Sequence, residues 1–175
     1  MRRFLFLAVF VAIFSLSVST LAYSLPKYQA ICERLGELEG YTVVDKCSGM
    51  NMQGNMGEMV SAEKNYANSE DKEKYFGVTV LGGGQAMMMW MPFMTHMTVE
   101  TDKELVKVVD IDGLKAGINY DKQENGGSLV VCLSKTPQSG CHAIFGVEFK
   151  NMDYKEALDL LKNFDLKSIE SLFEE

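Results

Sequence analysis

Apolar and polar residues alternate along much of the second half of the chain. Between residues 141 and 149 every second residue is apolar, and residues 75–81 repeat this period of two, which is typical of half-buried strands. Short turns between consecutive strands favour antiparallel pairing, so the pattern predicts a meander sheet. Further strands are expected at residues 41–46, 58–66, 98–101, 105–111, 114–120 and 128–134.

Helical spacing of apolar residues occurs on both sides of these strands. Residues 25–40 and 154–164 carry apolar stripes, and a further short helix is expected from Asp165. Gly40 would end the first helix, and Asp153 would cap the second. Because helices at the two ends of the chain can pack on one face of the sheet, we predict an α+β fold in two layers.

The first residues differ in composition from the rest of the chain. Arg2 and Arg3 precede an apolar run over residues 4–18, and small residues follow it. The run is shorter than the roughly 20 residues that span a bilayer, so it is typical of a secretory signal peptide. The alternative is an uncleaved membrane anchor. We therefore assign residues 1–22 to a signal peptide and residues 23–175 to one domain, expected in the periplasm or outside the cell with no stable membrane span after cleavage.

The charge balance narrows the classes of function. The chain has 17 Lys plus Arg against 24 Asp plus Glu, a formal net charge of −7, which opposes the phosphate backbone of nucleic acids. Its two histidines, His96 and His142, belong to no recognisable catalytic motif, and no nucleophile with a matching base can be assembled from the sequence. We therefore expect neither a nucleic-acid-binding protein nor an enzyme.

Four cysteines are expected to form two local disulfides. An even number of cysteines in an oxidising compartment favours bridges, and the simplest pairing joins Cys32 to Cys47 and Cys132 to Cys141. The first bridge would tie the N-terminal helix to the sheet, and the second would close a hairpin. The alternative is a redox or zinc-thiolate site, for which the chain lacks a Cys-x-x-Cys motif.

Methionine is concentrated in the middle of the chain, where ten of the twelve methionines lie between residues 50 and 97. One group falls in and just after residues 48–57, a segment rich in Gly and Asn that is expected to be a loop. The other falls in and after an apolar helix expected at residues 85–93, which follows three glycines. The two groups are Met50, Met52, Met56 and Met59, and Met87, Met88, Met89, Met91, Met94 and Met97.

Three hypotheses account for these methionines. The first is a structural role, because methionine fills irregular gaps in protein cores. The second, our main prediction, is a flexible apolar surface for a small hydrophobic molecule or a protein partner, in an exported binding module without a cofactor. Helical spacing would bring together on this surface Met87, Trp90, Met91, Met94 and Met97.

The third hypothesis is a Cu(I)-binding protein. Thioethers are soft ligands that select Cu(I), and exported proteins can use them where thiols are oxidised. Such a site would require several sulfur atoms to converge on one point. The candidate ligands are Met50, Met52, Met56, Met59 and His96.

Overall fold

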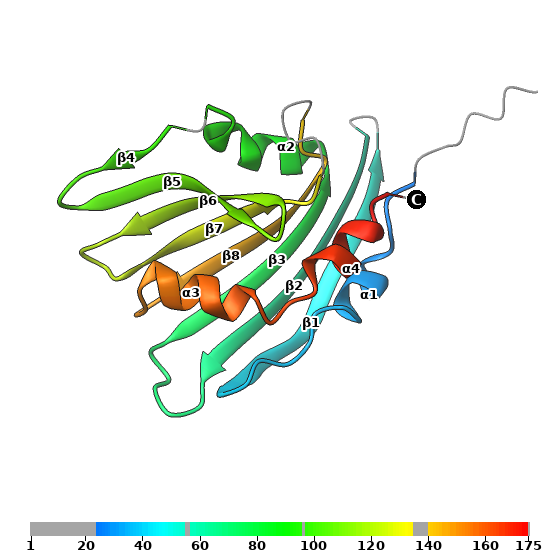
Figure 1. Cartoon of the computed structure of the whole chain (residues 1–175). Helices are drawn as coiled ribbons and strands as arrows, with labels where there is room; N and C mark the ends of the chain where they lie inside the picture. The colour runs from blue at the N-terminus through cyan, green and yellow to red at the C-terminus, as the bar shows by residue number, and fades with distance from the viewer. Residues whose placement is uncertain (1–23, 55–56, 96, 135–139, 175) are drawn as a thin grey trace, which may run out of the picture.

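An open antiparallel sheet of eight strands forms the centre of the protein (Figure 1). The computed structural model describes residues 24–54, 57–95, 97–134 and 140–174, so the expected signal peptide lies outside the described residues. The α+β class and the antiparallel pairing predicted from the sequence are confirmed. The strands are β1 (Tyr41–Gly54), β2 (Gly57–Asn68), β3 (Tyr75–Gly83), β4 (Val99–Glu100), β5 (Glu104–Ile111), β6 (Leu114–Asp121), β7 (Gly126–Cys132) and β8 (Ala143–Lys150).

The strand order is β1-β2-β3-β8-β7-β6-β5-β4, so two antiparallel runs meet where β3 pairs with β8. After β3 the chain passes through α2 (Gly84–Trp90) and the short 3-10 helix η1 (Met91–Phe93) to β4 at the far edge. It then returns strand by strand to β8. The sheet is therefore not one continuous meander, and the helical segment between β3 and β4, here named the crossover, connects its two runs.

The hairpin of β1 and β2 is the largest departure from the predicted strands. The composition predicts a loop at residues 48–57, but β1 continues to Gly54, which pairs with Gly57. As an edge strand, β1 is held by backbone hydrogen bonds to β2 and needs little side-chain packing. None of its residues is fully buried, so the apolar alternation that identifies a strand is missing here.

The N-terminal helix is much shorter than its apolar spacing predicts. α1 spans Tyr28–Cys32, whereas the spacing predicts a helix over residues 25–40. Leu38 is nevertheless buried in the irregular segment beyond α1. The hydroxyl group of Tyr66 fixes that segment by donating a hydrogen bond of 2.6 Å to the carbonyl oxygen of Gly36. The spacing thus identifies core positions without identifying the backbone conformation.

The two C-terminal helices begin where the sequence predicts. α3 spans Tyr154–Leu161 and α4 spans Leu166–Ser171. The side chains of Asp153 and Asp165 each accept a hydrogen bond from a backbone N–H group in the first turn of the following helix. Such caps satisfy donors that have no partner within the helix, which explains why both starts can be read from the sequence.

The side chains on one face of the sheet, here named the first face, form part of the main core. Neighbouring residues of a strand point to opposite faces, and Leu129 and Val131 of β7 both belong to this core. The same core contains Ile31 of α1, Leu161 of α3 and Ile169 of α4. Figure 1 shows these three helices on one side of the sheet.

A second, smaller core lies on the opposite face, here named the second face. Val130 and Cys132 alternate with the two β7 residues of the main core and pack in this second core. Their partners are Ala86, Trp90 and Phe93 of the crossover. α2 and η1 therefore cover part of the second face.

Both predicted disulfides are present. Cys32 bonds to Cys47 with 5.7 Å between Cα atoms, and Cys132 bonds to Cys141 with 5.8 Å. The first bridge joins α1 to β1, and the second closes the connection between β7 and β8. Two such bridges fit an oxidising, exported compartment. Within the described residues, no helix has the length and apolar character needed to cross a membrane.

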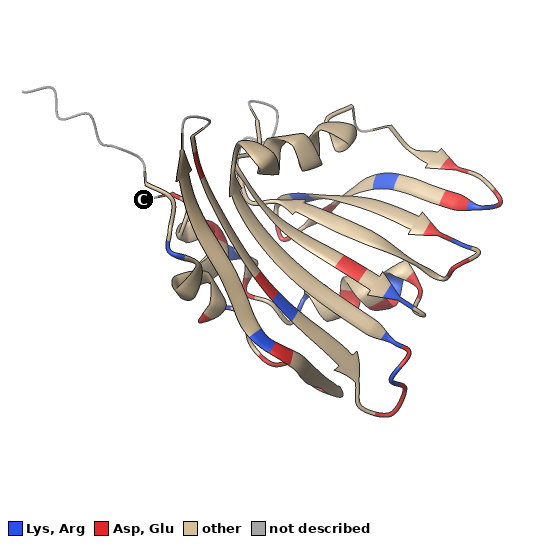
Figure 2. Ribbon diagram, turned by 180° about the vertical axis from the view of Figure 1, so that it is seen from behind, with Lys and Arg blue, Asp and Glu red and all other residues tan. Residues whose placement is uncertain are grey.

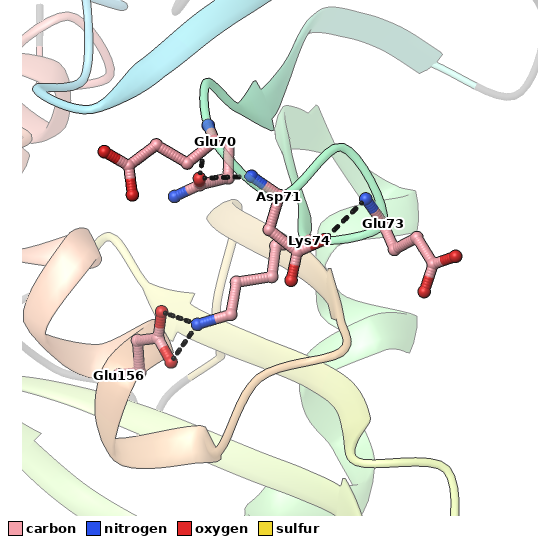
Figure 3. A network of polar contacts seen from close by, with 6 residues as sticks. Glu70, Asp71, Glu73, Lys74 and Glu156 are labelled. Atoms are coloured by element: carbon pink, nitrogen blue, oxygen red, sulfur yellow. Dashed lines mark hydrogen bonds and ion pairs between the residues drawn. The ribbon is translucent and has the colours of Figure 1, made fainter.

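The turn between β2 and β3 is tied to α3 by an ion pair. Asn68 shapes this turn, because its side-chain oxygen accepts hydrogen bonds of 3.0 Å from the backbone N–H groups of Glu70 and Asp71. The ammonium group of Lys74 then reaches both carboxylate oxygens of Glu156 on α3, at 2.8 and 3.1 Å (Figure 3). The hydrogen bond to Glu156 is the main reason that the pKa of Lys74 is raised.

Candidate functional site

The crossover leaves the sheet through a turn that requires glycine. Gly83 has a φ of 100°, and a Cβ atom at this position would overlap the carbonyl oxygen of Glu58. Glycine adopts such a conformation without steric cost. The turn directs the chain from the end of β3 into α2, over the second face.

Two aromatic side chains anchor the crossover to the sheet. Trp90 is 1% exposed, and its ring centroid lies 5.8 Å from that of Phe93. The Phe93 ring rests directly on Gly117 of β6, where a Cβ atom would overlap three ring carbon atoms. Ala86, Trp90 and Phe93 recur at i, i+4 and i+7 and form the buried side of the crossover.

The other side of the crossover consists mainly of exposed methionines. Among the described residues, the exposed large apolar side chains are seven methionines and two valines. Five of these methionines lie in or just after α2 and η1, and Met88 and Met97 are the most exposed, at 69% and 64%. These five residues are named the methionine surface: Met88, Met89, Met91, Met94 and Met97.

A second group of methionines lies on the β1–β2 hairpin. Met52 pairs with Met59, and Met50 precedes Met52 by two residues, so the three side chains share one face. Ser61 pairs with both Met50 and Leu81. Leu81 packs against the second core, which places the three methionines on the second face. Together they are named the hairpin methionines.

Both groups lie at the same end of the sheet. Met59 of the hairpin pairs with Gly83, and the next residue, Gly84, is the first of α2. Figure 1 shows α2 beside the end of β3, at the same end of the sheet as the end of β1. The fold therefore brings two methionine groups that are distant in sequence to one end of one face.

The residues predicted for the binding surface are divided between the two sides of the crossover. Trp90 is buried in the second core, and Met87 is half-buried with its terminal methyl group next to Gly140. Met88 and Met89, which the helical spacing leaves out, are exposed instead. Ala86, Trp90 and Phe93 share one helical period, but the helix is apolar on its other sides as well, so this period alone does not identify the buried side. The predicted residues that are exposed are Met91, Met94 and Met97.

The predicted copper ligands are only partly described. Met56 and His96 lie outside the described residues, and the remaining three are the hairpin methionines. In the described part of the chain, no group of three His, Cys, Asp or Glu side chains is placed to hold a metal ion.

The methionine surface lies in a segment without Asp, Glu, Lys or Arg. No Asp, Glu, Lys or Arg occurs between Lys74 and Glu100, and Figure 2 shows α2 without a charged residue, while many charged residues lie along the strands and at their turns. The chain as a whole has a net charge of −7. A molecule that binds to this segment would contact apolar side chains rather than charged Asp, Glu, Lys or Arg side chains.

Comparison with known proteins does not assign the chain to a family. No protein-family model, no curated protein and no solved structure matches it. The candidate site is therefore defined by its geometry alone.

Proposed function

We propose that the methionine surface binds an apolar segment of a protein partner, in an exported, non-enzymatic binding module. The supporting observation is that the apolar residues exposed at the surface are of different types from those buried in the main core. In the described residues, the main core is built mostly from Leu, Ile, Val and aromatic residues and contains one buried methionine, Met152. The exposed large apolar side chains are seven methionines and two valines. Poor packing alone would also expose leucine and isoleucine, so we infer that these apolar side chains are exposed in order to contact a partner.

The shape of the surface favours a protein over a small molecule. A small-molecule site is concave and surrounds most of its ligand, whereas α2 is a helix that lies on the sheet and presents its outer side. A complementary surface on another protein can cover such a helix. Contiguous apolar patches commonly mark protein contacts, and unbranched methionine side chains repack around partners of different shape.

Binding of a defined peptide tests this proposal. The probe is an amphipathic helical peptide with leucines on one face and lysines on the other, and its reference is a scrambled peptide of the same composition. We expect the exported protein to bind the amphipathic peptide more tightly, because only this peptide presents a continuous apolar face. Replacing Met88, Met91 and Met94 together by glutamine keeps the side-chain length but adds a polar group, and should weaken binding at least about tenfold in calorimetric titration.

Two control variants make the result specific. Val44→Gln changes a side chain that is 55% exposed on β1 and should leave peptide binding unchanged. Leucine in place of the same three methionines keeps the surface apolar and should preserve binding. The proposal is rejected if the scrambled peptide binds equally well or if Val44→Gln weakens binding as much as the triple glutamine variant. Binding to neutral lipid vesicles in place of the peptide would assign the surface to a membrane.

The hairpin methionines support Cu(I) binding as a second candidate function. Cross-strand neighbours such as Met52 and Met59 have Cβ atoms about 5 Å apart, and a diagonal neighbour such as Met50 lies within about 8 Å. Flexible thioether side chains can close these distances, and soft sulfur ligands select Cu(I). Met50 and Met52 are exposed, so an ion in solution can reach them.

Competition with a strong Cu(I) chelator, with ascorbate as the reductant, tests this second function. We expect the protein to withdraw Cu(I) from the chelator, and replacement of the three hairpin methionines by leucine to abolish the competition. Leucine at Met88, Met91 and Met94 is the matched control and should leave Cu(I) affinity unchanged. Absence of competition by the unaltered protein, or competition that survives the hairpin replacement, rejects a copper role for the hairpin.

A further inference from the structure

The thioether groups of the methionine surface are open to oxidants in solution. Mild oxidants attack the sulfur atoms of cysteine and methionine, and the rate depends on the exposure of the sulfur atom. All four cysteines are bonded in pairs, so the protein has no free thiol. The side chains of the methionine surface are between 38% and 69% exposed. They are therefore the sulfur groups that an oxidant reaches first.

The fold separates these methionines from the residues that hold the crossover on the sheet. Ala86, Trp90 and Phe93 form the buried side of the crossover, and the second core that contains them includes no methionine among the described residues. The disulfide between Cys132 and Cys141 lies in the same core and has no thiol to oxidise. Oxidation of the exposed side therefore leaves the packing beneath the crossover in place.

Oxidation would change the character of the methionine surface completely. Hydrogen peroxide transfers one oxygen atom to the thioether sulfur: the O–O bond breaks, an S–O bond forms, and the peroxide leaves as water. The sulfur atom loses two electrons and becomes a sulfoxide, which is polar where the thioether is apolar. Because residues 75–99 include no Asp, Glu, Lys or Arg, the sulfoxides would bring a strongly polar group to a segment that has no charged side chain of these types.

We propose that the methionine surface is a site of reversible oxidation, and that its oxidation releases the bound partner. The inference rests on the function proposed above, because it concerns the regulation of the same surface. Contact with an apolar partner would bury each sulfoxide oxygen without a hydrogen-bond donor, which opposes binding. Methionine sulfoxide reductases reverse the reaction: the oxygen atom leaves as water, a dithiol is oxidised to a disulfide, and the thioether returns.

Hydrogen peroxide and the amphipathic peptide described above provide the test. The exported protein is treated with dilute peroxide, catalase removes the excess, and peptide mass spectrometry measures the oxidation of each methionine. Once the methionine surface is oxidised, peptide binding should weaken at least about tenfold in calorimetric titration. The fluorescence emission of Trp90 should stay unchanged, because the second core keeps its packing.

Enzymatic reduction and leucine variants assign the effect to these thioethers. Sulfoxide reductases for both sulfoxide epimers, with dithiothreitol, should restore peptide binding, whereas dithiothreitol alone should not. Leucine forms no sulfoxide, so a variant with leucine at all five positions of the methionine surface should bind the peptide equally well before and after peroxide. The matched control has leucine in place of the three hairpin methionines, and peroxide should weaken its binding as much as that of the unaltered protein.

The outcomes distinguish this inference from the function on which it rests. If the untreated protein does not bind the peptide, the proposed function is rejected and regulation by oxidation with it. If the untreated protein binds but oxidation leaves its affinity unchanged, or the reductases do not restore a lost affinity, only the regulation is overturned. A shift of Trp90 emission that accompanies the loss of binding would also overturn it, because the loss would then come from a disrupted second core.

Discussion

The crossover should detach from the sheet when a single methyl group is added at the contact between Phe93 and Gly117. Alanine at Gly117 places a Cβ atom where ring carbon atoms of Phe93 now lie, so the ring has to leave its site. Phe93 is 7% exposed, and burial of such a side chain stabilises a protein by about 1.5 to 3 kcal/mol. Alanine also restricts the unfolded chain, which offsets about 0.5 to 1 kcal/mol of that loss. Gly117→Ala should therefore lower the free energy of unfolding by about 0.5 to 2.5 kcal/mol.

A second variant separates this contact from a general effect of alanine in a strand. In a Phe93→Ala background the ring is absent, so Gly117→Ala should raise the free energy of unfolding by about 0.5 to 1 kcal/mol. The effect of the same substitution thus changes sign between the two backgrounds, which urea unfolding of the four proteins can measure. Phe93→Ala itself should cost about 3 to 5 kcal/mol, within the total stability of about 5 to 15 kcal/mol that is usual for a domain.

Trp90 supplies a local measure of the same event. It is the one tryptophan of the chain, and it packs beside Phe93 in the second core. When Phe93 leaves the sheet, Trp90 emission should move to longer wavelength and become more sensitive to acrylamide, while the amides of β3 and β8 keep their protection from hydrogen exchange. Equal destabilisation in both backgrounds, or unchanged Trp90 emission, would refute the conclusion that Phe93 anchors the crossover.

Other parts of the structure give independent tests. Burial raises the pKa of Tyr66 to about 12, above its value of about 10 in an unfolded chain, so stability should be retained below pH 10 and fall between pH 10 and 12. Tyr66→Phe should make that fall smaller and, through the lost hydrogen bond to Gly36, cost about 1 kcal/mol in urea unfolding at neutral pH. Serine in place of both Cys32 and Cys47 should cost about 3 kcal/mol in the same assay, because the bridge closes a loop with a sequence separation of 15. Mild peroxide should oxidise the methionine surface well before Met152, which is 1% exposed, and equal rates in peptide mass spectrometry would contradict the described exposures.

The sequence predicts best those features whose cause is local. Asp153 and Asp165 mark helix starts, because a cap needs only the residues that follow it. The disulfide pairs are predictable from compartment and spacing. β8 is recognisable because its alternate residues fill the main core. By contrast, the edge strand β1 has no buried face, and nothing in its composition separates it from a loop.

The buried side of the crossover was not predictable, for a different reason. A helix that is apolar on nearly all sides has no polar face to show which side is exposed. From the sequence alone, Met87 and Trp90 are therefore as good candidates for an exposed surface as the methionines that are exposed in the structure. The sheet makes the choice, because Gly117 leaves room on the second face for the ring of Phe93. That pairing joins residues in different elements, and the spacing within either element does not reveal it.

The proposed binding surface combines a fixed backbone with adaptable side chains. Trp90, Phe93 and the bridge between Cys132 and Cys141 all lie in the second core beneath it, so a partner has only methionine side chains to order. Detaching the crossover adds the cost of ordering its backbone to the cost of binding. Gly117→Ala should therefore weaken binding of the amphipathic peptide several-fold, although no residue of the methionine surface is changed. Calorimetric titration of this variant against the unaltered protein measures the effect, and equal affinity would show that partner binding does not depend on the anchored crossover.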